Sequence, residues 1–171
     1  MAEWVVKTSD GTAYPVAVGN QSIPRCGLWV ADLILTTETA PQVGQVVTLS
    51  VAGTERRGAV LRSGSPTLRA TCRIVGGAGK MSTVLEPRDY RQQTLDQIVA
   101  DCLRDAGETS GDLAPIASTS LAHWTRSGER ASLTLARLWR KVDSSLSWRP
   151  TRDGAIAVHA DAWTVIDAGD L

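Results

Sequence analysis

The stretch "TLDQIVADCLRDAG", residues 94–107, is the most strongly patterned segment of the 171-residue sequence. Its apolar residues recur three or four positions apart, at Leu95, Ile98, Val99, Cys102, Leu103 and Ala106. That spacing places them on one face of an α-helix. Thr94 and Gln97 have the spacing of a capping box, and Gly107 is placed to end the helix. The sequence therefore predicts an amphipathic helix over residues 95–106, and we expect its apolar face to pack against the β-structure that precedes it.

The sequence before this helix is patterned as β-structure. Asp10-Gly11 is a turn dipeptide between "EWVVKT" and "AYPVAV", which is a hairpin signal. Residues 28–37, "LWVADLILTT", alternate, with Trp29, Ala31, Leu33 and Leu35 on one face. "QVVTLSV" and "ERRGAVLRSG" flank a turn at residues 52–54, and "LRATCRIV" forms the last strand. About six short strands joined by frequent turns are typical of a small barrel or sandwich.

The sequence after the helix predicts a smaller α/β module. Residues 108–127 have the composition of a loop with room for a short strand, and a second helix is expected over residues 129–143. "SLSWRP" and "AIAVHA" flank a turn at residues 151–154 and predict a hairpin. The fold class is therefore α+β. A small antiparallel β-barrel, residues 1–88, precedes an α/β module of helix, loop, helix and hairpin, residues 89–171.

The composition is that of a globular chain. Hydrophobic residues make up 43% and charged residues 21%, and the formal net charge is zero. There is no basic excess to indicate specificity for nucleic acid or an anionic membrane. The start, "MAEWVVKTSDG", lacks the pattern of a signal peptide, and no apolar run approaches the length of a membrane span. We expect neither nucleic-acid specificity nor a membrane anchor.

The segment "RIVGGAGKMSTVLE", residues 73–86, raises the question of a phosphate-binding loop. That motif requires a glycine five positions before Gly79 and a hydroxyl directly after Lys80. Ile74 and Met81 occupy these two positions, so neither requirement is met. Pro87 follows shortly, which disfavours the helix that must open at the lysine. We therefore expect no nucleotide cofactor, and ATP and GTP are not expected to bind.

The cysteines and histidines are not spaced as metal ligands. Cys26, Cys72 and Cys102 form no C-x-x-C pair, and neither His123 nor His159 belongs to a zinc-binding spacing. Three reduced thiols, most of them buried, are expected in a chain folded in the cytosol. The histidines are expected at surface or half-buried positions. The sequence thus predicts no metal site and no cofactor.

The acidic residues offer no convincing catalytic pair. Glu38, Glu86 and Asp89 are the carboxylates that a glycoside-cleaving site would draw on. Glu38 lies between threonines, Glu86 precedes Pro87 and Asp89 follows it by two residues, in turn settings where acidic residues act as caps. The G-x-S-x-G motif of hydrolases is absent from the sequence. We therefore predict no catalytic residues and no enzymatic activity.

Tryptophan is unusually frequent, with six tryptophans and no phenylalanine. Trp29, Trp139 and Trp148 lie on apolar faces and are expected in the core. Trp4, Trp124 and Trp163 lie near the termini or in a loop. They are candidate anchors of a protein–protein interface, with core packing as an equal alternative.

Three quoted stretches resemble the hub proteins of phage tails. This family includes the hub of Mu-like phages, the late-control protein D family and the N-terminal part of the type VI secretion spike protein. "TLDQIVADCLRDAG" resembles the helix after the first hub barrel. "HWTRSGERASLTLARLWRKVDSSLSWRPTRDGAIAV" resembles a later block, and "LWVADLILTTETAPQVGQVVTLSVAGTERRGAVL" is similar to the barrel. Typical hubs are longer and carry a second barrel, so the resemblance implies a reduced hub or one half of a divided hub.

The resemblance implies a structural role at the tail tip. Gly76, Gly77 and Gly79 would form the turn by which the chain leaves the barrel. A hub would form a ring, expected as a trimer, between the tail tube and the spike or fibre proteins. Its partners would be copies of itself, the tube, a distal tail or second hub protein and the spike. A single barrel is also expected to leave strand edges that such a ring would cover.

The expected location is the baseplate or tail tip of a virion that is assembled in the bacterial host's cytoplasm. Two alternatives belong to other classes of protein. One is a tail-associated peptidoglycan hydrolase, and the other is a non-catalytic carbohydrate-binding or adaptor module that uses exposed tryptophans.

Overall fold

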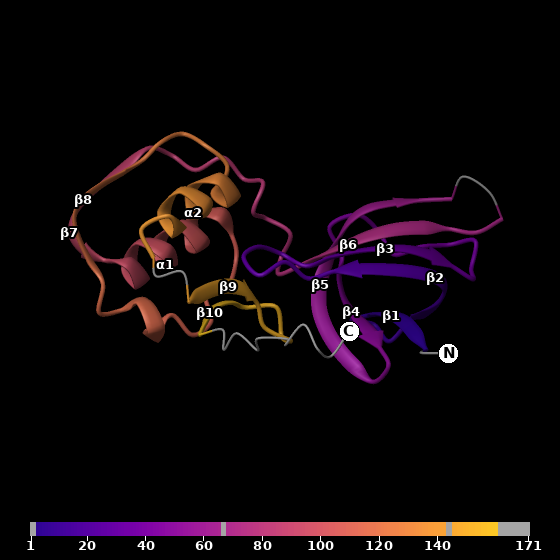
Figure 1. Ribbon diagram of the computed structural model, residues 1–171. Coiled ribbons are helices and arrows are strands. Elements are labelled where there is room, and N and C mark those ends of the chain that lie inside the picture. Colours follow the sequence, from indigo (N-terminus) through magenta and orange to yellow (C-terminus); the bar gives the residue numbers. More distant parts are fainter. Residues whose placement is uncertain (1–2, 66–67, 143–144, 161–171) are drawn as a thin grey trace, which may run out of the picture.

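The computed structural model describes residues 3–65, 68–142 and 145–160. Figure 1 shows two lobes, with a β-hairpin between the strands of one and the helices of the other. We call residues 3–76 the barrel lobe and residues 81–160 the helical lobe. Each lobe has its own cluster of buried apolar side chains.

The barrel lobe contains six antiparallel strands that close on themselves (Figure 1). The strands are β1 (Trp4–Thr8), β2 (Ala13–Ser22), β3 (Val30–Leu35), β4 (Val46–Val51), β5 (Thr54–Gly64) and β6 (Thr71–Gly76). Their order around the barrel is β1-β2-β3-β6-β5-β4, and pairing of β1 with β4 closes it. The predicted barrel is therefore confirmed. The expectation of open strand edges is wrong, because a closed barrel pairs every strand on both sides.

Alternation along the strands explains the barrel core. On β3 the side chains of Ala31, Leu33 and Leu35 are buried, whereas Asp32 and Ile34 between them are exposed. The turn between β4 and β5 is determined by the conformations of the two residues that form it. Its two residues are Ala52 (φ 48°) and Gly53 (φ 78°), and two left-handed residues match the twist of a tight hairpin.

The helical lobe follows the predicted order of helix, loop, helix and hairpin, with one additional strand pair. Its elements are β7 (Arg88–Thr94), α1 (Leu95–Ala106), the 3₁₀-helix η1 (Ala114–Ile116), β8 (Ser120–Arg126), α2 (Ala131–Trp139), β9 (Leu146–Pro150) and β10 (Ile156–Ala160). Strands β7 and β8 pair antiparallel and pass along the outer side of the helices (Figure 1). The sequence did not indicate β7, because Tyr90 is its only buried side chain and no alternation is visible.

Helix α1 has the predicted bounds, buried face and caps. All six apolar residues of its face are buried. The Thr94 N–H donates to the Gln97 side chain at 3.4 Å, and Gly107 ends the helix in a left-handed conformation (φ 86°). Helix α2 is shorter than the predicted 129–143.

The packing partner expected for α1 was wrong. The helix packs against β7, α2 and η1 within the helical lobe rather than against the barrel core. Among the described helices, none combines the length and the apolarity needed to cross a bilayer.

Other segments join the two lobes. The hairpin β9–β10 lies between barrel and helices in Figure 1, and backbone hydrogen bonds fix it there. The Gly27 N–H donates to the Trp148 carbonyl at 2.9 Å, and the Arg57 N–H donates to the Arg152 carbonyl at 2.7 Å. The hairpin and the turn that leaves β6 therefore set the arrangement of the lobes.

Candidate functional site

The turn that leaves the barrel is the segment that resembled a phosphate loop. Gly77 (φ 77°) and Gly79 (φ 74°) both adopt the left-handed conformation, which turns the amides of Ala78 and Lys80 toward one point. The carboxylate of Glu108 occupies that point. It accepts hydrogen bonds from the Ala78 N–H at 2.7 Å and from the Lys80 N–H at 2.6 Å. The backbone donors that a phosphate group would use are thus bound to a side chain of the same protein.

Gly76, directly before this turn, lies against a tryptophan. A Cβ at this position would be 2.5 Å from the Trp29 Nε1 and 2.8 Å from the Pro150 Cγ. Its backbone N–H donates to the Trp29 carbonyl at 2.9 Å. Glycine is therefore required here by the close approach of two side chains, one from each lobe.

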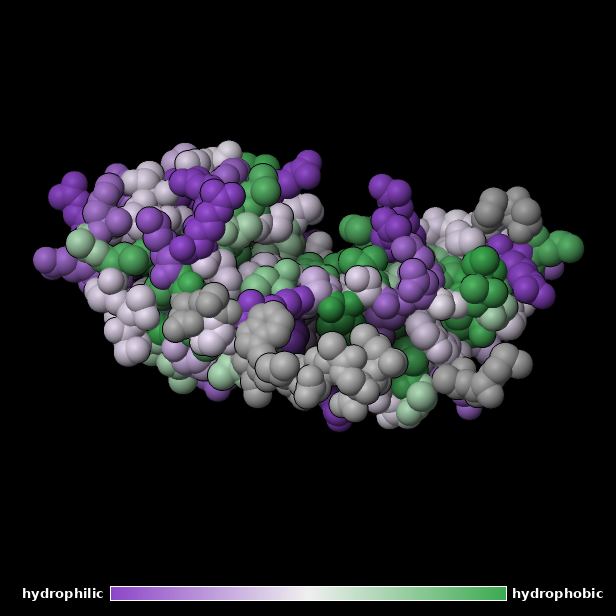
Figure 2. Space-filling model, in the orientation of Figure 1, coloured by the Kyte–Doolittle hydropathy of each residue, from purple (hydrophilic) through white to green (hydrophobic). Residues whose placement is uncertain are grey.

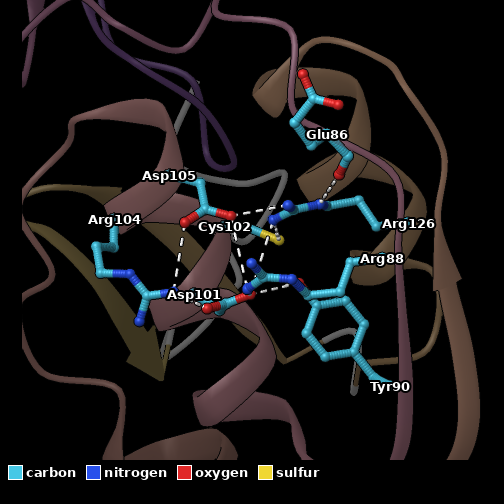
Figure 3. Close-up of polar contacts among 8 residues, drawn as sticks. All are labelled: Glu86, Arg88, Tyr90, Asp101, Cys102, Arg104, Asp105 and Arg126. Atoms are coloured by element: carbon cyan, nitrogen blue, oxygen red, sulfur yellow. Dashed lines mark hydrogen bonds and ion pairs between the residues drawn. The ribbon is translucent and has the colours of Figure 1, made fainter.

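A cluster of charged side chains links α1 to the strands β7 and β8 (Figure 3). We call it the ion cluster; its members are Arg88, Tyr90, Asp101, Arg104, Asp105 and Arg126. The Arg126 side chain on β8 is completely buried. Its Nη2 donates to the Asp105 Oδ2 at 2.8 Å, and its Nε donates to the Glu86 carbonyl at 2.7 Å.

Asp101 is the second anion of the ion cluster. Its carboxylate accepts hydrogen bonds from the Tyr90 hydroxyl at 2.7 Å and from the Arg88 and Arg104 guanidinium groups. Both aspartates are thus engaged by arginines, which leaves neither as a free general base. The arrangement is suited to holding α1 on the β7–β8 pair rather than to catalysis. One feature of the sequence could have indicated the ion cluster, because Arg126 lies two residues after Trp124 and therefore shares its strand face.

The ion cluster makes folding stability dependent on pH. Burial favours a higher pKa for Asp101, but the hydrogen bonds from Tyr90 and Arg88 outweigh burial and hold its pKa below the ordinary value of 3.8. A carboxyl group whose pKa is lower in the folded than in the unfolded chain stabilises the fold fully above its unfolded pKa. That stabilisation is lost as the pH falls through the lowered value.

We therefore expect the difference in unfolding free energy between the wild type and Asp101→Asn to shrink below pH 3.8. Urea denaturation from pH 7 down to pH 2.5 measures it. Tyr90→Phe, which removes one hydrogen bond and keeps the ring, should weaken the same pH dependence in part. A difference that stays constant over the whole range would contradict the assignment.

The histidines and the candidate carboxylates do not come together as a catalytic or metal site. Glu38, Glu86 and Asp89 are exposed. Asp89 accepts a hydrogen bond from the Thr125 hydroxyl at 2.6 Å, and His123 Nε2 lies 3.8 Å from it. Within the described residues, no group of three or more histidine, cysteine or acidic side chains is arranged to hold a metal ion.

Only one of the three cysteines is accessible. Cys26, in the loop between β2 and β3, is exposed, whereas Cys72 and Cys102 are buried. Burial raises the pKa of the Cys72 thiol to about 11 and also raises the pKa of Cys102. Because the thiolate is the reactive form, the two buried thiols are expected to be inert in the folded protein.

A thiol titration with an aromatic disulfide reagent should consume one thiol per folded chain and three after denaturation. Cys26→Ser should abolish the reaction in the folded state, and Cys72→Ser should leave it unchanged. Rapid reaction of two or more thiols in the folded protein would show that a buried cysteine is accessible.

The structure separates the three tryptophans named as interface candidates. Trp124 is 9% exposed and packs on Tyr90 with ring centroids 5.6 Å apart, so little of its surface is left for a partner. Trp4 is partly buried against the barrel core. Trp163 lies outside the described residues. Of the tryptophans predicted in the core, Trp29 and Trp148 are buried, and Trp139 is partly buried against the core of the helical lobe.

The outer wall of the barrel carries an apolar groove. Val18 on β2 and Ile34 on β3 are directly paired across the strands and are 59% and 38% exposed. They line a cavity of about 790 Å³ together with Arg62 and the ion pair Arg73–Asp32, whose two hydrogen bonds measure 2.6 and 2.8 Å. Figure 2 shows apolar residues exposed on the barrel lobe. We call this region, defined by Val18, Ile34 and Arg62, the barrel groove.

No protein-family model matches the sequence, and no curated protein matches it. Solved structures do match. The 43 kDa tail protein of prophage MuSo2 from Shewanella oneidensis is 18% identical, with a TM-score of 0.69 over 92% of this chain and 54% of its own. A tail protein from Neisseria meningitidis is 13% identical, with a TM-score of 0.58 over 98% of this chain and 56% of its own.

A third match comes from another system. A component of the Escherichia coli type VI secretion system, described as structurally similar to two bacteriophage T4 tail proteins, has a TM-score of 0.52 at 12% identity. The match covers 94% of this chain and 45% of that one. The chain thus spans about half the length of the solved structures it matches. These matches include both lobes, and the chain has the fold of phage tail proteins.

Proposed function

We propose that this protein is a structural, non-catalytic component of a phage tail, of the hub type. In this proposal it forms a ring at the tail tip or baseplate, between the tail tube and the spike or fibre proteins. The observation that carries the proposal is the match to two phage tail proteins over 92% and 98% of the chain. A match over both lobes supports a shared mode of assembly better than a barrel alone would, because small barrels serve many unrelated functions.

The barrel groove supports a role in protein–protein contact. A closed barrel has no free edge to pair with a neighbour, so a contact made by its strands uses their outer faces. The groove combines exposed aliphatic side chains with Arg62 and a bidentate ion pair. Apolar surface together with arginine is the composition enriched at interface centres. In this proposal the groove contacts a neighbouring tail protein or a second copy of the chain.

The finer features of the assembly form part of the same proposal. The ring is a trimer, as the hub resemblance implies. Within each chain, residues 1–88 and 89–171 act as two domains. A closed ring is also the usual outcome of head-to-tail contacts that do not extend into filaments. The particle is assembled in the host cytoplasm, and the protein remains at the tail tip of the virion.

The position of the protein in intact particles tests the proposal. An antibody against the chain, used with gold labels on purified particles, should mark one end of the tail. Quantitative mass spectrometry should give a copy number that is a small multiple of three. Labelling along the whole tail, labelling confined to the head, or absence from the particle would each overturn the hub assignment.

Surface variants test the contact surface separately. Ile34→Glu or Val18→Glu should leave the thermal midpoint of the isolated protein unchanged and should prevent its incorporation into particles. Val43→Glu is the matched control, because Val43 is 63% exposed and does not line the groove. Normal incorporation of both groove variants would show that the barrel groove is not an interface.

A further inference from the structure

The turn at residues 77–80 has the geometry of an anion-binding nest. Successive backbone N–H groups that converge on one point form such a concave site for negatively charged oxygen atoms. Here Gly77 and Gly79 supply the left-handed conformations, and the amides of Ala78 and Lys80 supply the donors. The two hydrogen bonds, at 2.7 and 2.6 Å, are as short as charge-assisted bonds are.

The ligand of this nest comes from the helical lobe. Glu108 follows α1, about 30 residues further along the chain, and only 6% of it is exposed. The fit is close, because a Cβ added at Gly77 would lie 2.6 Å from the Glu108 Oε2. The contact therefore attaches the end of α1 to the end of the barrel through one carboxylate.

There is space beside the nest. A cavity of about 200 Å³ is lined by Gly77 and Ala78 and also by Arg57 and Thr109, the residue after Glu108. Arg57 and Asp153 place one positive and one negative side chain on this cavity. The cavity borders the nest at Gly77 and Ala78, and we expect a small anion to enter from this side once the glutamate side chain is removed.

We propose that residues 77–80 form an oxyanion-binding site whose resident ligand is the side chain of Glu108. The site takes small carboxylates, and the internal ligand keeps it closed while it holds the two lobes together. This assignment goes beyond the proposed function, because it concerns the chain's own chemistry and holds whether or not the protein is a tail hub.

Chemical rescue tests the site. Glu108→Ala leaves the two amides without an acceptor, so the variant should be less stable than the wild type, and sodium formate should restore stability in a saturable way. With a dissociation constant of about 1 mM, roughly 100 mM formate raises the folding equilibrium constant about 100-fold. Sodium chloride at the same concentration should have no comparable effect.

Two controls separate site binding from a general salt effect. Glu55→Ala removes an exposed glutamate of the barrel and should show no rescue by formate. The double variant Gly77→Ala with Glu108→Ala should not be rescued either, because the added Cβ would lie 2.6 Å from the position of the carboxylate oxygen and would clash with it. Equal stabilisation of all variants by formate, or failure of formate to stabilise Glu108→Ala at any concentration, would overturn the proposal.

A measurement on the wild type keeps the proposal testable if Glu108→Ala does not fold. The amides of Ala78 and Lys80 should exchange with deuterium at least about tenfold more slowly than unprotected amides, since each donates to a buried carboxylate. In Glu108→Gln, which keeps the size of the side chain but supplies a single acceptor oxygen, at least one of the two should exchange faster. Unprotected exchange at both amides in the wild type would overturn the assignment.

Discussion

Replacing Arg126 with alanine is expected to lower the free energy of unfolding by about 3 kcal/mol. The side chain is completely buried, and its guanidinium group binds Asp105 and the Glu86 carbonyl. Its loss leaves that carbonyl without its donor and leaves a cavity between α1 and β8. The expected loss lies at the lower end of the range for breaking a buried ion pair, because Arg88 and Arg104 still neutralise the two aspartates.

Arg104→Ala is the matched control for this variant. Arg104 belongs to the same ion cluster, but its side chain is 69% exposed, and exposed ion pairs contribute roughly 0–1 kcal/mol. Urea denaturation of both variants, followed by circular dichroism, gives the comparison. Equal losses in the two variants would show that burial of Arg126 is not what makes it important.

Replacing Trp29 with alanine is expected to cost about 3–5 kcal/mol, the usual range for a buried aromatic side chain. Trp29 is 1% exposed and lies at the end of the barrel that faces the helical lobe. Two glycines make room for its ring, because a Cβ at Gly58 would be 2.9 Å from Cη2 and a Cβ at Gly76 would be 2.5 Å from Nε1. The substitution would therefore open a cavity that a rigid barrel cannot close.

Trp29→Phe distinguishes the contribution of the ring from that of the indole N–H. Within the described part of the chain, the Trp29 Nε1 has no hydrogen-bond acceptor. Phenylalanine removes this unsatisfied donor and keeps a six-membered aromatic ring in the site, so it should cost less than alanine. A thermal melt that gives the same midpoint for both variants would show that the lost volume is not the cause.

The elements whose positions were predicted correctly are those that local sequence patterns determine. Helix α1 depends on an apolar repeat, a capping box and a terminal glycine, all within residues 94–107. The predicted hairpin β9–β10 depends on two short apolar stretches around a turn, and Trp148 pairs with Val158 in it. Interactions between residues close in sequence determine these elements, so a single sequence reveals them.

The elements that were missed lack such a pattern. Strand β7 has one buried residue, Tyr90, among polar ones, and it is a strand because β8 pairs with it. The sequence placed the candidate interface residue Trp124 in a loop. In the structure, the pairing of β7 with β8 packs it against Tyr90. Neither strand β7 nor the buried position of Trp124 can be predicted from residues 88–94 or 120–126 alone, because each strand depends on pairing with the other.

The sequence by itself determined the succession of barrel strands, helix α1 and final hairpin, the buried face of α1, and the failure of the phosphate-loop motif at Ile74 and Met81. Only the tertiary structure decided that β1 pairs with β4 and closes the barrel, that Arg126 is buried, and that the Glu108 carboxylate binds the amides of Ala78 and Lys80. The physical reason is distance along the chain. Periodicity and caps record contacts within one or two turns, whereas a hydrogen bond between residues about 30 positions apart leaves no local pattern.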